Sequence, residues 1–156
     1  MFKKTIIAGS VAMVAGSLSG QALAAEYKGP DLKGETITIT CPWTGAEEGM
    51  FKKVVANFEK KTGAVVKHSC SQSSEQQIVI DIKAGSPTNI STFPQPGLAA
   101  NMAAIGGLVP LGDKVRDQVK KDFAAGESWA DLGTYTNKEG KKDFYGIFFN
   151  VNLKSL

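Results

Sequence analysis

Residues 36–63 read TITITCPWTGAEEGMFKKVVANFEKKTG, and this stretch decides the expected fold. Its first five residues alternate Thr and Ile, which is typical of a half-buried strand. After a short loop, apolar residues recur at helical spacing from Met50 to Phe58, and Gly63 supplies a stop signal. The stretch therefore predicts a strand, a loop and an amphipathic helix, in that order.

The same order of elements repeats further along the chain. A second strand is expected over 64–70, and a helix with Ile78 and Ile82 follows through a capping box at Ser74 and Gln77. A third strand over 89–93 and a helix over 97–104 come next. Alternating strands and helices predict an α/β fold with a doubly wound, mainly parallel sheet.

The remainder of the chain is less regular. Apolar residues four apart predict a helix over 113–123, and a polar, Gly-rich composition predicts a surface loop over 126–142. Residues 145–151 have a strand-like composition. Since the chain stops at 154–156, directly after this expected strand, we expect a truncated polypeptide.

The first 24 residues have the order of features of a secretory signal peptide. Lys3 and Lys4 precede 14 residues without charge, from Thr5 to Leu18, whereas a membrane span needs about 20. Small residues then predict cleavage after Ala24, and no cysteine lies there for lipid attachment. The mature protein is therefore expected to be exported, soluble and, in a host with an outer membrane, periplasmic.

The charge and the cysteines of the mature chain exclude several classes of function. Removal of residues 1–24 leaves 16 basic and 15 acidic side chains, which provides no broad attraction for nucleic acid or anionic lipid. Cys41, Cys70 and His68 are too few for a structural zinc site, which needs four ligands. Neither metal nor cofactor is expected, and the cysteines are either a structural disulfide or two quiet thiols.

The loops that follow the three expected strands are the places to look for a ligand, because crevices in parallel sheets lie beyond the carboxyl ends of the strands. They are residues 42–45, 71–74 and 93–96, and they contain aromatic, hydroxyl and carboxamide groups but no cationic side chain. An aromatic face and planar polar groups suit a neutral sugar. A purely structural role for Trp43 and Phe93 in a core remains open.

The sequence favours a non-enzymatic protein. Glu47 and Glu48 are adjacent and face different directions, so they do not form the carboxylic acid pair that sugar hydrolysis needs. The same two carboxylates occupy the site where a helix N-terminus would bind phosphate. Two alternatives stay open: a fragment of an exported glycoside-acting enzyme with its catalytic groups beyond Leu156, and a small exported structural or interaction protein.

Several segments together resemble the extracellular solute-binding proteins (family 1) of carbohydrate ABC transporters, and more narrowly the α-glucoside-binding subgroup. Besides the signal peptide, these segments are Gly34–Ile39, Pro42–Gly45, Phe58–Gly63, Glu75–Ile78, Gly85–Pro87, Phe93–Leu98 and Leu108–Leu111. The resemblance implies a periplasmic-binding-protein-like fold of two lobes. Residues 25–156 would then be part of the N-terminal lobe, with the second lobe absent from this chain.

The resemblance also implies a function and a set of ligand contacts. A monomeric receptor would bind a neutral mono- or oligosaccharide of the maltose, trehalose or sucrose type between its lobes and deliver it to permease subunits in the inner membrane. The contacts expected by position are Trp43, Thr44, Glu47, Gln72, Phe93, Gln95 and Asn150. Asn89 stands where relatives usually carry aspartate, which we expect to alter a local cap more than the ligand site.

Within this family, Cys41 and Cys70 fall at the carboxyl ends of two neighbouring strands. Neighbouring strands lie about 4.8 Å apart, which is within the Cα separation that a disulfide tolerates. We therefore expect a Cys41–Cys70 disulfide.

Overall fold

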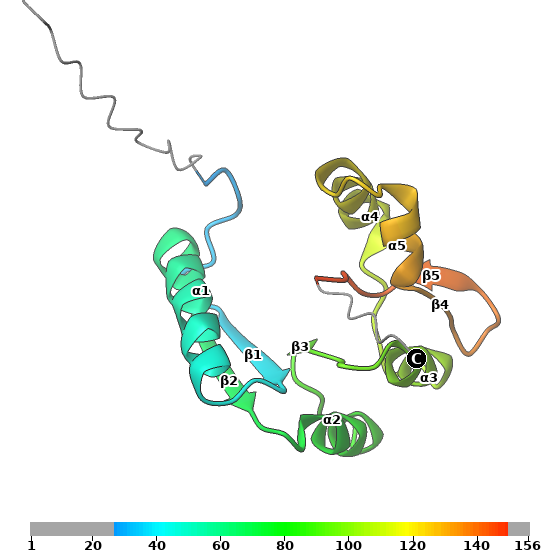
Figure 1. Cartoon of the computed structure of the whole chain (residues 1–156), viewed down its shortest axis with the longest axis horizontal. Coiled ribbons are helices and arrows are strands. Elements are labelled where there is room, and N and C mark those ends of the chain that lie inside the picture. The colour runs from blue at the N-terminus through cyan, green and yellow to red at the C-terminus, as the bar shows by residue number, and fades with distance from the viewer. Residues whose placement is uncertain (1–26, 150–156) are drawn as a thin grey trace, which may run out of the picture.

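A computed structural model describes residues 27–149, so the predicted signal peptide and the last seven residues lie outside the described range (Figure 1). The chain alternates strands and helices in its first part and then adds three helices and a hairpin. In chain order the elements are β1 (Thr36–Cys41), α1 (Ala46–Thr62), β2 (Val65–Cys70), α2 (Ser74–Lys83), β3 (Ile90–Ser91), α3 (Pro96–Ala104), α4 (Gly112–Asp122), α5 (Glu127–Leu132), β4 (Thr134–Thr136) and β5 (Lys142–Phe144).

A three-stranded parallel sheet in the order β2-β1-β3 organises the first part of the chain. The register of β1 and β2 runs from Thr36 opposite Val65 to Cys41 opposite Cys70. Because the strand order reverses after β2, right-handed crossovers place α1 and α2 on opposite faces of the sheet (Figure 1). The predicted α/β class with a parallel sheet is thereby confirmed.

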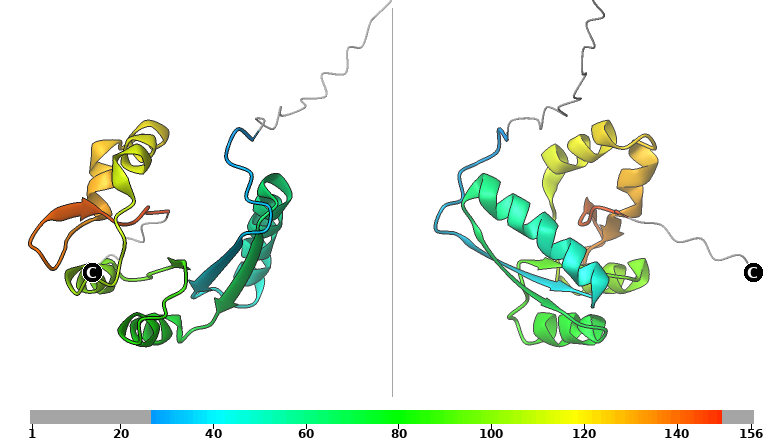
Figure 2. Two further views of the ribbon diagram at one scale, coloured as in Figure 1. Left: turned by 180° about the vertical axis from the view of Figure 1, so that it is seen from behind. Right: turned by 60° about the vertical axis from the view of Figure 1, so that its left-hand side comes forward.

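Beyond α3, the chain builds a second structural group around an antiparallel hairpin. Strands β4 and β5 pair with Thr134 opposite Phe144, and a core of Val119, Ala130 and Phe144 joins the hairpin to α4 and α5. The chain passes from β3 to α3 through residues 92–95 and from α3 to this group through residues 105–111 (Figure 2). The predicted helices over 97–104 and 113–123 are confirmed as α3 and α4.

Two expectations for this second group were wrong. The range 126–142, predicted to be a loop, contains α5 and β4 and ends at the start of β5. The strand expected over 145–151 is not formed at 145–149, since β5 ends at Phe144, and residues 150–151 lie outside the described range. The first error arose because α5, β4 and β5 are short and polar, so that contacts with distant residues, not local periodicity, define them. The second arose because an apolar composition alone does not provide a strand with a pairing partner.

The sequence signal for the end of α1 was right, and the signal for the start of α2 was wrong. Gly63 closes α1 with φ 76°, and its N–H donates to the Glu59 carbonyl oxygen at 2.8 Å. Ser74, predicted to cap α2, is instead its first residue, and the preceding Ser73 at the N-cap makes no side-chain capping hydrogen bond within the described chain. The predicted capping box is therefore wrong.

The third strand is shorter than expected because a side chain takes over part of its pairing. Asn89 Oδ1 accepts hydrogen bonds from the backbone N–H and the hydroxyl of Thr38, both at 2.8 Å. The Asn89 N–H in turn donates to Thr38 Oγ1 at 2.9 Å. Regular pairing with β1 is thus confined to Ile90 and Ser91.

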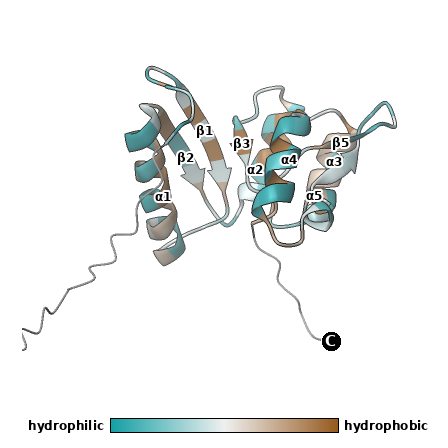
Figure 3. Cartoon of the chain, turned by 90° about the horizontal axis from the view of Figure 1, so that it is seen from above, coloured by the Kyte–Doolittle hydropathy of each residue, from teal (hydrophilic) through white to brown (hydrophobic). Residues whose placement is uncertain are grey.

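An apolar groove of about 190 Å³ lies between α1 and the sheet. Val55 is buried on this side of α1, but Val54 is 66% exposed and Ile90, on β3, is 50% exposed. Figure 3 shows hydrophobic residues along β1 and β3. The groove is lined by Ile37, Ile39, Phe51, Val54, Val55, Phe58, Val66 and Ile90.

Candidate ligand-binding site

The loops after β1, β2 and β3 all leave the sheet at its carboxyl edge, because the three strands are parallel. Two backbone hydrogen bonds extend the pairing up to these loops. The Ser71 N–H donates to the Cys41 carbonyl oxygen, and the Thr92 N–H donates to the Thr40 carbonyl oxygen, both at 2.9 Å. The fold therefore brings the starts of the three predicted ligand loops together.

A disulfide joins the first two of these loops at their bases. Cys41 and Cys70 are bonded, with a Cα–Cα distance of 4.4 Å, and Cys41 is fully buried. The predicted disulfide is confirmed, and the open alternative of two quiet thiols is excluded.

The first loop places Trp43 within a row of aromatic side chains. The Trp43 ring centroid lies 4.8 Å from that of Phe51 on α1 and 5.6 Å from that of Phe149, with a nearly edge-on arrangement to Phe149. Phe51 in turn contacts His68 of β2 edge-on at 5.6 Å. Trp43 is half-buried, so Phe51 and Phe149 contact its ring while part of its surface stays accessible.

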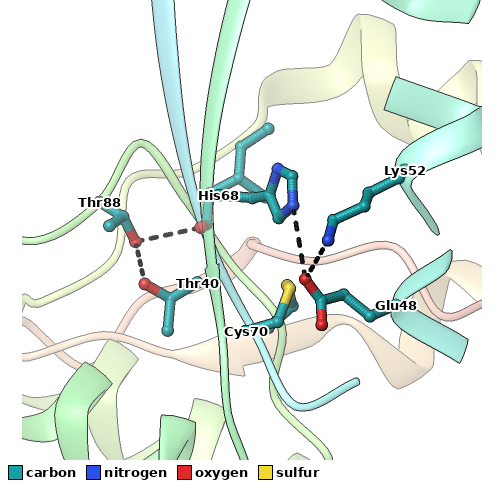
Figure 4. Close-up of a disulfide and its surroundings, with 8 residues drawn as sticks. Thr40, Glu48, Lys52, His68, Cys70 and Thr88 are labelled. Carbon is teal, nitrogen blue, oxygen red and sulfur yellow. Dashed lines mark hydrogen bonds and ion pairs between the residues drawn. A yellow bond between two sulfur atoms is a disulfide. The ribbon is translucent and has the colours of Figure 1, made fainter. Parts of the chain in front are cut away.

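The two carboxylates at the start of α1 have different surroundings. Glu47 is exposed, whereas Glu48 faces β2, with its Oε1 2.7 Å from Lys52 Nζ and 3.9 Å from His68 Nε2 (Figure 4). The hydrogen bond from Lys52, with its positive charge, lowers the pKa of Glu48 below its ordinary value. Glu48 is thus a paired carboxylate and not a proton donor at neutral pH.

The second and third loops meet at the start of α2. Gln95 Nε2 donates to Glu75 Oε2 at 3.4 Å, which links the third loop to the first turn of α2, directly behind the second loop. Within residues 27–149, neither Glu75 Oε1 nor Ser74 Oγ has a hydrogen-bond partner, although both atoms are buried. Glu75 was missed as a site residue, and the available signal was its position directly behind the second loop.

Buried oxygens without a partner in the protein are rare, and such atoms usually bond to ordered water or to a bound group. The hydroxyls of a sugar can donate to such oxygens, and the aromatic row around Trp43 offers a face for its C–H groups. No group of three or more His, Cys, Asp or Glu side chains that could hold a metal ion occurs in residues 27–149. The arrangement is suited to binding a neutral polar molecule.

Comparison with known proteins gives two relatives and no matching family model. The chain is 49% identical over 129 residues to the Alpha-glucosides-binding periplasmic protein AglE of Rhizobium meliloti strain 1021, a match that covers 83% of this chain and 28% of that protein. It is 27% identical over 133 residues to the Osmoprotective compounds-binding protein GgtB of Synechocystis sp., covering 83% of this chain and 30% of that protein.

Over 83% of its length, the chain is thus similar to two proteins that are named for binding small molecules, one of which is named as periplasmic. The resemblance inferred from the sequence is confirmed, and the chain spans less than a third of the length of these two relatives. A crystal structure of the uncharacterized protein lmo0859 of Listeria monocytogenes EGD-e aligns with 62% of this chain and 28% of its own, at 19% identity and a TM-score of 0.43. No helix within residues 27–149 is long and apolar enough to cross a membrane.

The other predicted site residues have less defined surroundings. Thr44 and Gln72 are exposed at the same edge of the sheet, Phe93 is half-buried in the third loop, and Asn150 lies outside the described residues.

A larger cavity, of about 360 Å³, lies elsewhere, between α4, α5 and the hairpin. None of the predicted site residues lines it. Its lining comprises Pro110, Gly112, Asp113, Arg116, Asp131, Thr134, Lys142, Asp143 and Phe144.

Proposed function

We propose that this polypeptide is the periplasmic substrate-binding component of an ABC importer for carbohydrates, with α-glucosides as its ligands. One observation carries the proposal: the 49% identity over 129 residues to a protein named for α-glucoside binding. A match of that length in a chain of 156 residues includes all three loops at the carboxyl edge of the sheet.

The chemistry of the described residues supports a neutral sugar as the ligand. The unpartnered Glu75 Oε1 would accept a hydrogen bond from a sugar hydroxyl. Trp43 would present its accessible surface to the apolar face of a pyranose. The proposed contacts are Trp43, Thr44, Glu47, Gln72, Phe93, Gln95 and Asn150, together with Glu75.

We also propose the finer organisation that the resemblance implies. Residues 1–24 would be the signal peptide, and residues 25–156 would form part of the N-terminal lobe of a two-lobe, periplasmic-binding-protein-like receptor. The open groove beside Val54 and Ile90 supports a larger lobe, because apolar side chains at the surface of a single lobe need cover. The monomeric receptor would pass its sugar to permease subunits in the inner membrane.

We propose binding without catalysis. Both relatives are named as binding proteins, and the one carboxylate at the first loop that faces the sheet, Glu48, is paired with Lys52. Incubation with maltose or trehalose should accordingly release no glucose. Glucose release that depends on the protein would instead support the exported enzyme.

Calorimetric titration of the full-length product of the reading frame with maltose, trehalose and sucrose tests the proposal. At least one of these sugars should bind, and Trp43→Ala should weaken its binding about tenfold or more through the loss of the stacking face. Phe123→Ala is the matched control, since Phe123 stacks on Trp129 in the other part of the molecule. If none of the three sugars binds, the α-glucoside assignment is wrong.

A second variant examines the polar side of the site. Glu75→Ala should weaken sugar binding about tenfold, because it removes a buried acceptor and the partner of Gln95. Glu139→Ala removes a carboxylate from the exposed turn between β4 and β5 and should leave the affinity unchanged. Equal affinities for the two variants would remove Glu75 from the site.

A further inference from the structure

We infer that the Cys41–Cys70 disulfide is a positioning element for the ligand loops, which sets the affinity for sugar in addition to stabilising the fold. The inference rests on the proposed function. It differs from the ordinary reading of a disulfide, in which the cross-link contributes only to stability.

The position of the disulfide in the sheet is the first observation. The two cysteines form the last register pair of the β1–β2 ladder, and each directly precedes a ligand loop. The Ser71 N–H still bonds to the Cys41 carbonyl oxygen, but Pro42 has no N–H with which β1 could continue. The covalent bond therefore joins β1 and β2 at the point where backbone pairing from β1 ends.

The aromatic row supplies a second, independent link between this point and the proposed sugar contact. His68 precedes Cys70 by two residues, so the two side chains lie on the same face of β2. His68 contacts Phe51, and Phe51 contacts Trp43. A frayed end of β2 would move His68 and, through Phe51, the ring of Trp43.

The register of β1 and β2 allows the effect of the disulfide on the ligand loops to be measured separately from its effect on the stability of the protein. In the chain-entropy account, a disulfide stabilises a protein according to the length of the loop that it closes. Cys41 and Cys70 are 29 residues apart, and so are Thr36 and Val65, the first register pair of the same ladder. A disulfide moved to that pair would close a loop of the same length at the opposite end of the strands, away from the ligand loops.

Three forms of the full-length product test the inference: the oxidised wild type, Cys41→Ala/Cys70→Ala, and the same double variant carrying Thr36→Cys/Val65→Cys. Maltose, trehalose and sucrose are titrated into each form, and urea unfolding gives the stability. The double alanine variant should bind about tenfold more weakly, since its loops must be ordered on binding. The relocated disulfide, verified by a thiol count, should restore stability but not affinity.

The inference is overturned if the double alanine variant binds as the wild type does, or if the relocated disulfide restores both quantities. Should the variants fail to fold, the folded wild type is reduced with dithiothreitol, which yields two cysteine thiols and cyclic oxidised dithiothreitol. Circular dichroism then verifies the fold, and a lower affinity of the reduced protein is expected. If the oxidised wild type binds none of the sugars, the proposed function fails and this inference fails with it. If the oxidised wild type binds a sugar and the reduced protein binds the same sugar with equal affinity, the inference alone fails.

Discussion

The sheet half of the molecule (residues 27–93) and the hairpin half (residues 96–149) differ in how their polar side chains are satisfied. The hairpin half buries Val119, Ala130 and Phe144 to 5% exposure or less. Both halves also have exposed apolar side chains, Val54 and Ile90 in the sheet half and Val109 and Phe149 in the hairpin half, each at least 50% exposed. Among the described residues, however, the buried side-chain oxygens without partners lie in the sheet half, beside its loops.

The charged groups show the same contrast. In the hairpin half, Arg116 bonds to both Glu127 and Asp131, and Lys120 lies within 3.2 Å of Glu127 and Asp117. These groups satisfy one another, and at the surface such pairs contribute little to stability. The densest cluster of charge in the described residues is therefore paired within itself, whereas the unpartnered buried oxygens of the sheet half belong to the proposed binding site.

The largest expected effect concerns the closed core of the hairpin half. Phe144→Ala should lower the free energy of unfolding by about 4 kcal/mol, because it removes a large buried side chain and leaves a cavity. Val54→Ala, at an exposed position of the sheet half, should change it by about 0.5 kcal/mol or less. Urea unfolding measures the loss in the free energy of unfolding for both variants. Equal losses would show that the core around Phe144 contributes no more to stability than the exposed position of Val54 does.

An intermediate effect is expected where a side chain replaces strand pairing in the sheet half. Asn89→Ala should cost about 1 kcal/mol, because the N–H and hydroxyl of Thr38 lose their acceptor. Asn89→Asp keeps an acceptor oxygen in the same place and should be close to wild type. A loss of the same size for both variants in thermal unfolding would mean that the hydrogen bonds are not the cause.

The smallest effect concerns the ion pairs of the hairpin half. Hydrogen bonding from Lys120, assisted by Arg116, holds the pKa of Glu127 below its ordinary value of 4.5. A carboxylate with a lowered pKa in the folded state stabilises the protein above the pKa of the unfolded state, and this contribution is lost as the pH falls through the folded-state pKa. Glu127→Gln should therefore reduce the loss of stability between pH 5 and acid conditions.

Denaturant unfolding across this pH range, in low and in high salt, measures the difference. Glu139→Gln is the control, because Glu139 is exposed and its nearest cation, Lys138, lies 3.7 Å away. A pH dependence of Glu127→Gln identical to that of the wild type would show that the ion pairs of Glu127 add nothing to stability at pH 5 and above.

The amino-acid sequence by itself determined the elements of the sheet half. The alternation in 36–40 and the helical spacing up to Gly63 are local patterns, and β1, α1 and β2 follow them closely. The same patterns predicted the order of strands and helices. The resemblance to a known family, carried by motifs along the sequence, added the expected disulfide and the similarity to binding proteins. These features depend on residues near one another in the sequence or on motifs that the sequence displays directly.

Only the tertiary structure decided the rest. The hairpin forms because Lys142–Phe144 meets Thr134–Thr136, and neither segment has a periodicity of its own. Asn89 takes over pairing because Thr38 lies opposite, and Trp43 packs against Phe149 from the far end of the described chain. Glu75 became a candidate only because one of its buried oxygens has no partner within residues 27–149. The physical reason is common to all of these: a short element or a single side chain gains its free energy from contacts distant in sequence, which local patterns do not specify.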